Sequence, residues 1–205
     1  MKLMENEALA KSWNLFILNG DLNALSQVYF FYYDFLFDYG VKHTEDRQLV
    51  EDAIQNVFLN LIMSRKNIHQ VKNLTGYLIS SCRRQLFADA SKQKRTLFSE
   101  HLSEDQFNYF KSPDQTAEHE NKEHLHQVIE KCVGNLTPRQ QEILFLRFEK
   151  EISYAEIAEM LDISVDSCYK LIYRTVKMIR SEAEKILNKE QRMIFWLCLV
   201  KYVEG

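Results

Sequence analysis

The chain has 205 residues, with 26 lysines and arginines against 29 acids, and a formal net charge of −3. Its 46% apolar residues, five glycines and two prolines are typical of a helical protein with small domains joined by a linker. No nucleophile–base pair, glycine-rich phosphate loop or carboxylate constellation is present, so we expect no enzyme. The N-terminus lacks a basic-then-apolar signal, and the chain is expected to be cytoplasmic.

The four cysteines are far apart, with no Cys-x-x-Cys pair, and are therefore expected to be free thiols. Three histidines, His119, His124 and His126, could in principle join Cys132 in a zinc site. Their spacing matches no common ligand pattern, so we expect no metal and no cofactor.

The region from 13 to 39 is rich in aromatic residues and reads as two helices. Asn19, Gly20 and Asp21 separate the helices, and Gly40 is expected to end the second. So many large rings indicate the core of a small helical domain rather than a base-stacking site. The rings belong to Trp13, Phe16, Tyr29, Phe30, Phe31, Tyr32, Tyr33, Phe35, Phe37 and Tyr39.

Residues 45–61 predict an amphipathic helix. Its apolar face consists of Val50, Ala53, Ile54, Val57, Phe58 and Leu61. An outer strip is polar with one leucine and consists of Asp52, Gln55, Asn56 and Leu59. Taken alone, such a strip is typical of the solvent-exposed face of a helix whose other face packs in the core.

Residues 64–95 contain eight bases and one acid, Asp89. In a chain of negative net charge, this concentration predicts a phosphate-binding surface with strong salt dependence. Residues 96–125 have the opposite balance, seven acids against two bases, and no sustained apolar period. They are expected to be an acidic, partly extended linker.

Residues 136–183 predict a helix-turn-helix. Thr137 with Gln140 and Ser153 with Glu156 form two capping boxes, and Asp162 lies where the turn needs a positive φ. Ser164 can cap the last helix, which has Val165, Cys168, Ile172, Thr175 and Ile179 on its inner stripe. Such a motif places its second helix in the DNA major groove.

The outer face of that last helix is basic and aromatic, with no acid between Ser167 and Arg180. Residues near the start of a recognition helix read base edges and later ones hold phosphates. The residues expected to read bases are Asp166, Ser167, Tyr169, Lys170 and Tyr173. The residues expected to contact the phosphate backbone of the DNA are Arg174 and Lys177. A solvated basic face is the alternative for an isolated helix, but the capped helix and turn before it favour DNA binding.

Three segments of this region, LTPRQQ at 136–141, SYAEIA at 153–158 and SVDSC at 164–168, resemble the C-terminal DNA-binding region of sigma-70 family initiation factors. A further segment, DAIQNVF at 52–58, resembles the segment by which these factors bind the clamp helices of RNA polymerase. Asn56 stands where the family usually has an acid. With both motifs in this order, the chain resembles the extracytoplasmic-function (ECF) group of sigma factors.

The resemblance implies an all-α fold of two small helical domains joined by the acidic linker. Residues 1–95 would be a region 2-like domain for polymerase binding and minus-ten melting, and 96–125 the linker. Residues 126–187 would be a region 4-like domain for the minus-thirty-five element, followed by an apolar tail at 188–205. The outer strip of the helix at 45–61 would bind core RNA polymerase, and the linker would thread through the polymerase.

The resemblance also assigns opened promoter DNA to the basic segment. Flat or polar side chains suit opened bases, and cationic ones suit phosphates. The candidate minus-ten residues are Tyr77, Arg83, Arg84, Gln85, Lys92, Lys94 and Arg95.

The tail includes the apolar run 193–203, which is too short to cross a bilayer. It is expected to pack on the C-terminal domain or to dock an inhibitory anti-sigma factor. Two other functions stay open: a helix-turn-helix regulator that acts without polymerase, and a helical adaptor that binds only proteins. The regulator would not need the outer strip of the helix at 45–61, and the adaptor would show no salt-dependent DNA affinity.

Overall fold

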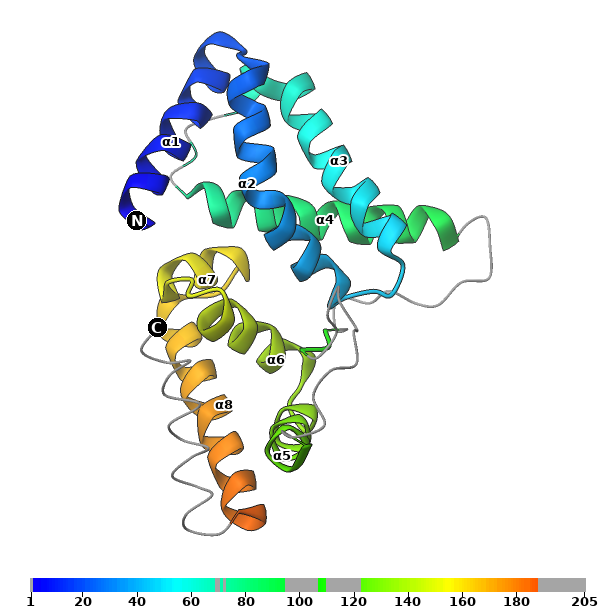
Figure 1. Cartoon of the computed structure of the whole chain (residues 1–205), viewed down its shortest axis with the longest axis vertical. Helices are drawn as coiled ribbons and strands as arrows, with labels where there is room; N and C mark the ends of the chain where they lie inside the picture. Colours follow the sequence, from blue (N-terminus) through cyan, green and yellow to red (C-terminus); the bar gives the residue numbers. More distant parts are fainter. Residues whose placement is uncertain (1, 69–70, 72, 95–106, 110–122, 188–205) are drawn as a thin grey trace. The chain divides into compact units, whose positions relative to one another are not determined.

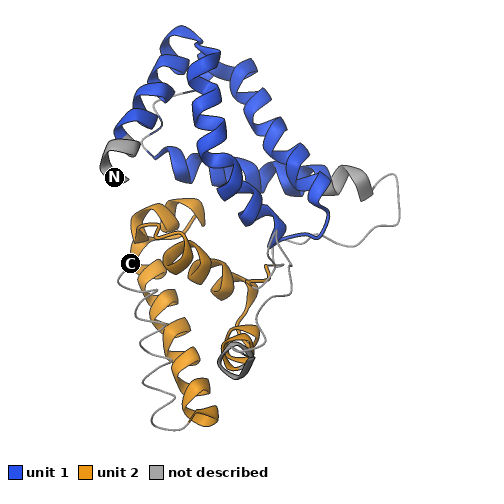
Figure 2. Cartoon of the chain, in the orientation of Figure 1, with its two compact units in different colours: residues 1–103 blue, residues 104–205 orange. Residues whose placement is uncertain are grey.

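The computed structural model describes residues 2–68, 71, 73–94, 107–109 and 123–187, and every regular element within them is helical. The all-α expectation is therefore confirmed. The chain divides into two compact units, residues 1–103 and 104–205 (Figures 1 and 2). The tail at 188–205 and most of the expected linker lie outside the described residues.

The first unit contains four long helices and one 3₁₀ turn. They are α1 (Lys2–Asn19), α2 (Leu22–Val41), α3 (Arg47–Ser64), η1 (Arg65–Asn67) and α4 (Leu74–Lys94). The expected break between α1 and α2 is confirmed, with Gly20 at a φ of 74° and Asp21 capping α2 through its carboxylate. Asp46 caps α3 by accepting from the Leu49 amide at 3.0 Å.

Gly40 has a packing role rather than a helix-ending one. Helix α2 runs one residue beyond it, to Val41, instead of ending at Gly40 as expected. A Cβ at Gly40 would lie 2.4 Å from Cγ1 of Val50, which is a buried residue of α3. The glycine therefore allows α2 and α3 to approach closely.

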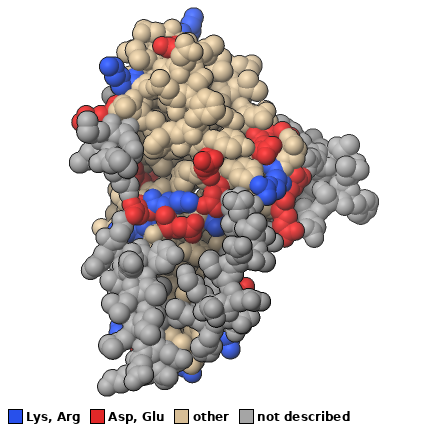
Figure 3. All heavy atoms as spheres, in the orientation of Figure 1, with Lys and Arg blue, Asp and Glu red and all other residues tan. Residues whose placement is uncertain are grey.

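Most of the N-terminal rings are buried or half-buried, as expected, and Phe16, Tyr39 and Tyr32 are the most enclosed. Two are not: Phe30 is 74% exposed and Phe31 49% exposed, because consecutive positions of one helix cannot all face the same core. The expectation that the rings are all core was wrong for this pair. In Figure 3 the upper part of the visible face, formed by the first unit, carries few acids or bases.

The second unit contains α5 (Glu123–Gly134), α6 (Pro138–Leu144), a π-helical turn (Phe145–Glu149), α7 (Tyr154–Met160) and α8 (Val165–Ile186). Both predicted capping boxes are formed, at Thr137 and at Ser153. Val128, Cys132 and Val133 of α5 pack with Ile179 and Ala183 of α8 in one apolar cluster. This cluster joins the first helix of the unit to its last.

Part of the segment expected to be linker packs on the second unit. Phe107 is buried, with its ring centroid 5.7 Å from that of Phe145. The Tyr109 amide donates to Oε1 of Gln141 at 3.0 Å. Helix α5 also begins at Glu123, inside the segment expected to be a partly extended linker.

Cys82, Cys132 and Cys168 are buried free thiols. Burial raises the pKa of the Cys82 thiol from 9.0 to about 12, and it raises the pKa of the other two as well. Among the described residues, no three metal-ligating side chains are placed to hold an ion. None of the described helices has the length and apolar character that crossing a membrane requires.

Candidate nucleic-acid interface

The outer strip of α3, called here the α3 strip, consists of Asp52, Gln55, Asn56 and Leu59, and it divides into an outward part and an inward part. Asp52, Gln55 and Leu59 are exposed, and Leu59 keeps 55% of its surface open. Asp52 accepts a hydrogen bond from Gln48 one turn earlier, at 2.9 Å. These three side chains form a solvent-facing row with an apolar group at its end.

Asn56 is placed differently, since it is half-buried and turned toward α4. Its amide donates to Oδ2 of Asp89 at 3.2 Å, and the Gln85 amide donates to the same oxygen at 2.8 Å. The Asn60 amide in turn donates to Oε1 of Gln85 at 3.4 Å. A chain of polar side chains, called here the α3–α4 seam, therefore joins the two helices.

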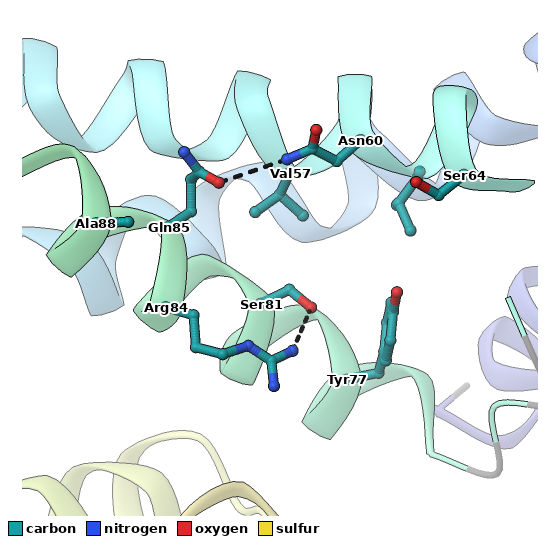
Figure 4. A pocket seen from close by; sticks show the side chains of 9 residues that line it. Val57, Asn60, Ser64, Tyr77, Ser81, Arg84, Gln85 and Ala88 are labelled. Atoms are coloured by element: carbon teal, nitrogen blue, oxygen red, sulfur yellow. Dashed lines mark hydrogen bonds between the residues drawn. The ribbon is translucent and has the colours of Figure 1, made fainter. Parts of the chain in front are cut away.

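A hollow of about 320 Å³ opens between α3 and α4 beside this seam (Figure 4). The helix α4 side carries Tyr77, Ser81, Arg84 and Gln85, with Arg84 exposed and donating to the Ser81 hydroxyl at 3.3 Å. Asn60 faces them from α3. One flat ring, one guanidinium and two amides around an open hollow match what an unpaired base and its phosphate offer.

The other predicted minus-ten residues do not join this group. Arg83 lies off the lining, with its guanidinium carbon 5.8 Å from the ring centroid of Phe87. Lys92 and Lys94 are in the last turn of α4, where side chains are not described, and Arg95 lies outside the described residues.

The turn of the helix-turn-helix is fixed from three sides. Asp162 has a φ of 51°, as the sequence predicted, and the Ile163 amide donates back to the Ala158 carbonyl at 2.9 Å. The Arg139 guanidinium of α6 donates to the Leu161 carbonyl at the end of α7. Arg139 also pairs with the buried Glu142 carboxylate at 3.4 Å, so α6 sets the position of the turn.

Helix α8 presents the predicted outer face to solvent. The seven predicted residues, Asp166, Ser167, Tyr169, Lys170, Tyr173, Arg174 and Lys177, are all exposed. Its inner stripe is also as predicted except at its start, since Val165 is 43% exposed. Val165 was wrongly placed in the core because it lies in the first turn, at the edge of the packed face.

Sequence reasoning missed four contributors: Asn60, Asp89, Arg147 and Tyr154. The first two complete the α3–α4 seam. Tyr154 stacks on Tyr169 of α8, and Arg147 stacks on Tyr154. The contacts of Asn60 with Gln85, of Asp89 with Asn56 and of Tyr154 with Tyr169 join separate helices, so helical periodicity carried no signal for them.

The family comparison concerns the second unit. Residues 126–179 match the model of sigma-70, region 4. The second unit contains a sigma-70 region 4 domain. The match covers the capped α6, the turn and most of α8, and it confirms the resemblance drawn from the three sequence segments. Such a region belongs to non-enzymatic initiation factors, in keeping with the expectation of no enzyme.

Among solved structures, the chain is similar to the sigma factor RpoE from Bartonella quintana, which was determined in complex with the anti-sigma factor NepR. The TM-score is 0.52, the identity is 15%, and the match covers 78% of this chain and 96% of that one. At this identity the similarity concerns the fold, and it extends well beyond the region 4 domain. No curated protein matches the sequence.

Proposed function

We propose that this chain is an ECF-type sigma factor, which binds core RNA polymerase and directs initiation at specific promoters. The observation that carries the proposal is the region 4 match over a helix-turn-helix whose outer residues are all exposed. In this role the region 4 domain reads the minus-thirty-five element in the major groove. Arg174 and Lys177 hold the phosphates, and the residues before them meet base edges.

The first unit supplies the other two functions of such a factor. The outward part of the α3 strip, Asp52, Gln55 and Leu59, docks on the polymerase, and Asn56 supports it through the α3–α4 seam. The hollow between α3 and α4 takes the opened minus-ten strand through Tyr77, Arg84 and Gln85. Arg83 and the bases after it, Lys92, Lys94 and Arg95, add electrostatic attraction along the strand.

The partners follow from this role: core RNA polymerase, promoter DNA and an inhibitory anti-sigma factor. The last is supported by the similar fold of RpoE, a sigma factor seen with its anti-sigma factor. A factor that acts on RNA polymerase and promoter DNA would do so in the bacterial cytoplasm. No bound cofactor is needed, because initiation chemistry belongs to the polymerase.

The docking role is tested by co-elution of the purified chain with core RNA polymerase. The triple variant Asp52→Ala, Gln55→Ala, Leu59→Ala removes the three exposed groups without touching the core. We expect its polymerase affinity to fall at least tenfold, since the loss of a single binding hot spot within the row would cost about 2 kcal/mol.

The matched control is the double variant Asn14→Ala, Leu18→Ala, which removes an exposed amide and an exposed leucine from α1. It should bind polymerase as the wild type does. A wild-type chain that binds duplex DNA tightly but ignores polymerase would instead be an independent regulator. One that binds neither DNA nor polymerase would be an adaptor for other proteins.

A further inference from the structure

Three flat groups stack in sequence from the turn after α6 to the outer face of α8. The Arg147 guanidinium carbon lies 4.7 Å from the ring centroid of Tyr154. The Tyr154 ring stacks on Tyr169 with centroids 4.0 Å apart and planes 20° apart. Arg147 is itself anchored, because it donates to the Ile152 carbonyl at 3.1 Å. The stack therefore fixes one face of the Tyr169 ring.

The polar side chains beside Tyr169 are already paired within the helix. Lys170 and Asp166 form an ion pair at 2.6 Å, and the Ser164 and Ser167 hydroxyls are 2.8 Å apart. Tyr169 and, one turn later, Tyr173 remain 51% and 69% exposed. The start of the recognition helix thus offers aromatic surface more readily than free charge.

The DNA major groove has one apolar group on its base-pair edges, the C5-methyl of thymine. A ring whose orientation is fixed before binding loses little conformational freedom when it contacts such a group. Cytosine and guanine carry no such methyl group, and the face of an aromatic ring does not satisfy the hydrogen-bonding groups that they present at this edge.

We propose that Tyr169 is a specificity-determining residue that reads thymine methyl groups in the duplex target, and that Tyr154 and Arg147 are the residues that position it. This inference rests on the proposed function, because it assumes that α8 enters the major groove. Tyr173 extends the same aromatic surface along the groove.

The experiment starts from selection of duplexes by the full-length chain from a randomised double-stranded library. The enriched duplex is then made with deoxyuridine in place of each thymine in turn, which removes only the methyl group. Fluorescence anisotropy gives the ratio of the two dissociation constants at each position. For the wild-type chain we expect a loss of about fourfold at one or two thymines, the factor for burying one carbon of this size.

Variants separate contact from positioning. Tyr169→Ala should bind the thymine and uracil duplexes equally, whereas Tyr169→Phe, which keeps the ring, should still discriminate. Tyr154→Ala should lower the discrimination without changing the salt dependence of binding, and Tyr154→Phe should restore it. A general loss of structure would weaken both duplexes together and leave the ratio unchanged.

The results also separate this inference from the proposed function. A selected duplex that binds tightly, with no thymine-to-uracil effect at any position, overturns the thymine proposal and leaves the DNA-binding role intact. A discrimination that persists in Tyr169→Ala also overturns it. If no duplex is enriched at all, the reading of DNA by α8 is wrong, and this inference is wrong with it.

Discussion

At the scale of single residues, Asp89 joins helix α3 to the side chains that line the hollow on α4. One carboxylate oxygen accepts from Asn56 of the α3 strip and from Gln85 at the α4 hollow. It therefore links the residue nearest the proposed polymerase contact to one that faces the proposed DNA strand. An amide that loses such a partner inside a protein costs free energy, because water does not fully replace the bond.

Replacing this carboxylate should destabilise the first unit. Asp89→Ala leaves two amides without their acceptor, and we expect a loss of about 1–2 kcal/mol in the free energy of unfolding, measured by urea titration. The control is Asp52→Ala, whose carboxylate is exposed and which should change stability by less than about 0.5 kcal/mol. Equal stability of the two variants would mean that the α3–α4 seam contributes nothing.

The buried Cys82 thiol should make the free energy of unfolding depend on pH. Its pKa is about 12 in the folded chain, against 9.0 for an ordinary thiol, because burial disfavours the thiolate. Its contribution to stability is therefore complete below pH 9 and is lost as the pH rises toward 12, since the unfolded chain releases this proton first.

The comparison that isolates this thiol uses Cys82→Ala at two pH values. Between pH 8 and pH 10 the cost of the substitution should shrink by about 1.4 kcal/mol, because only the wild-type chain carries the titration. Urea unfolding at both pH values measures it. A cost that is the same at pH 8 and pH 10 would contradict the raised pKa.

At the scale of helices, the crossing of α2 and α3 depends on Gly40. Gly40→Ala places a methyl 2.4 Å from Val50, so we expect a loss of about 1–3 kcal/mol. Val50→Ala in the same chain should recover part of that loss, which a double-mutant cycle in urea would show as coupling. Gly134→Ala is the control, because nothing lies within 4 Å of its added methyl and alanine favours the helix.

The recognition helix α8 makes an electrostatic prediction. Arg174→Ala and Lys177→Ala should each reduce the slope of log affinity against log salt by about one, because each removes one phosphate contact. Anisotropy with any duplex between low and moderate salt measures the slope. Lys185→Ala is the control, since Lys185 is paired with Glu182 near the other end of the helix; an equal effect there would mean general charge attraction rather than a defined face.

The helices themselves were largely predictable, because their signals are local. The capping boxes at Thr137 and Ser153, the cap at Ser164 and the positive φ of Asp162 were all read from neighbouring residues. The contacts that shape the sites were not, since Asn60 to Gln85 and Tyr154 to Tyr169 join separate helices. Periodicity says which face of a helix is apolar but not which residue it meets.

At the scale of the whole molecule, each of the two compact units carries a candidate binding surface of its own. The first has an exposed row on α3 and a polar hollow between α3 and α4, and the second a helix-turn-helix within a sigma-70 region 4 domain. Neither unit alone would account for promoter-specific initiation. The proposed function therefore requires both units to act together on one polymerase and one promoter.

The most direct measurement is transcription by core RNA polymerase with and without the chain on fragmented bacterial DNA, with the 5′ ends of the transcripts sequenced. The account predicts new start sites that depend on the chain and share an upstream two-part sequence. Those sites should vanish with the Asp52, Gln55, Leu59 triple variant and persist with the Asn14, Leu18 control. Start sites that are the same with and without the wild-type chain would contradict the sigma-factor role.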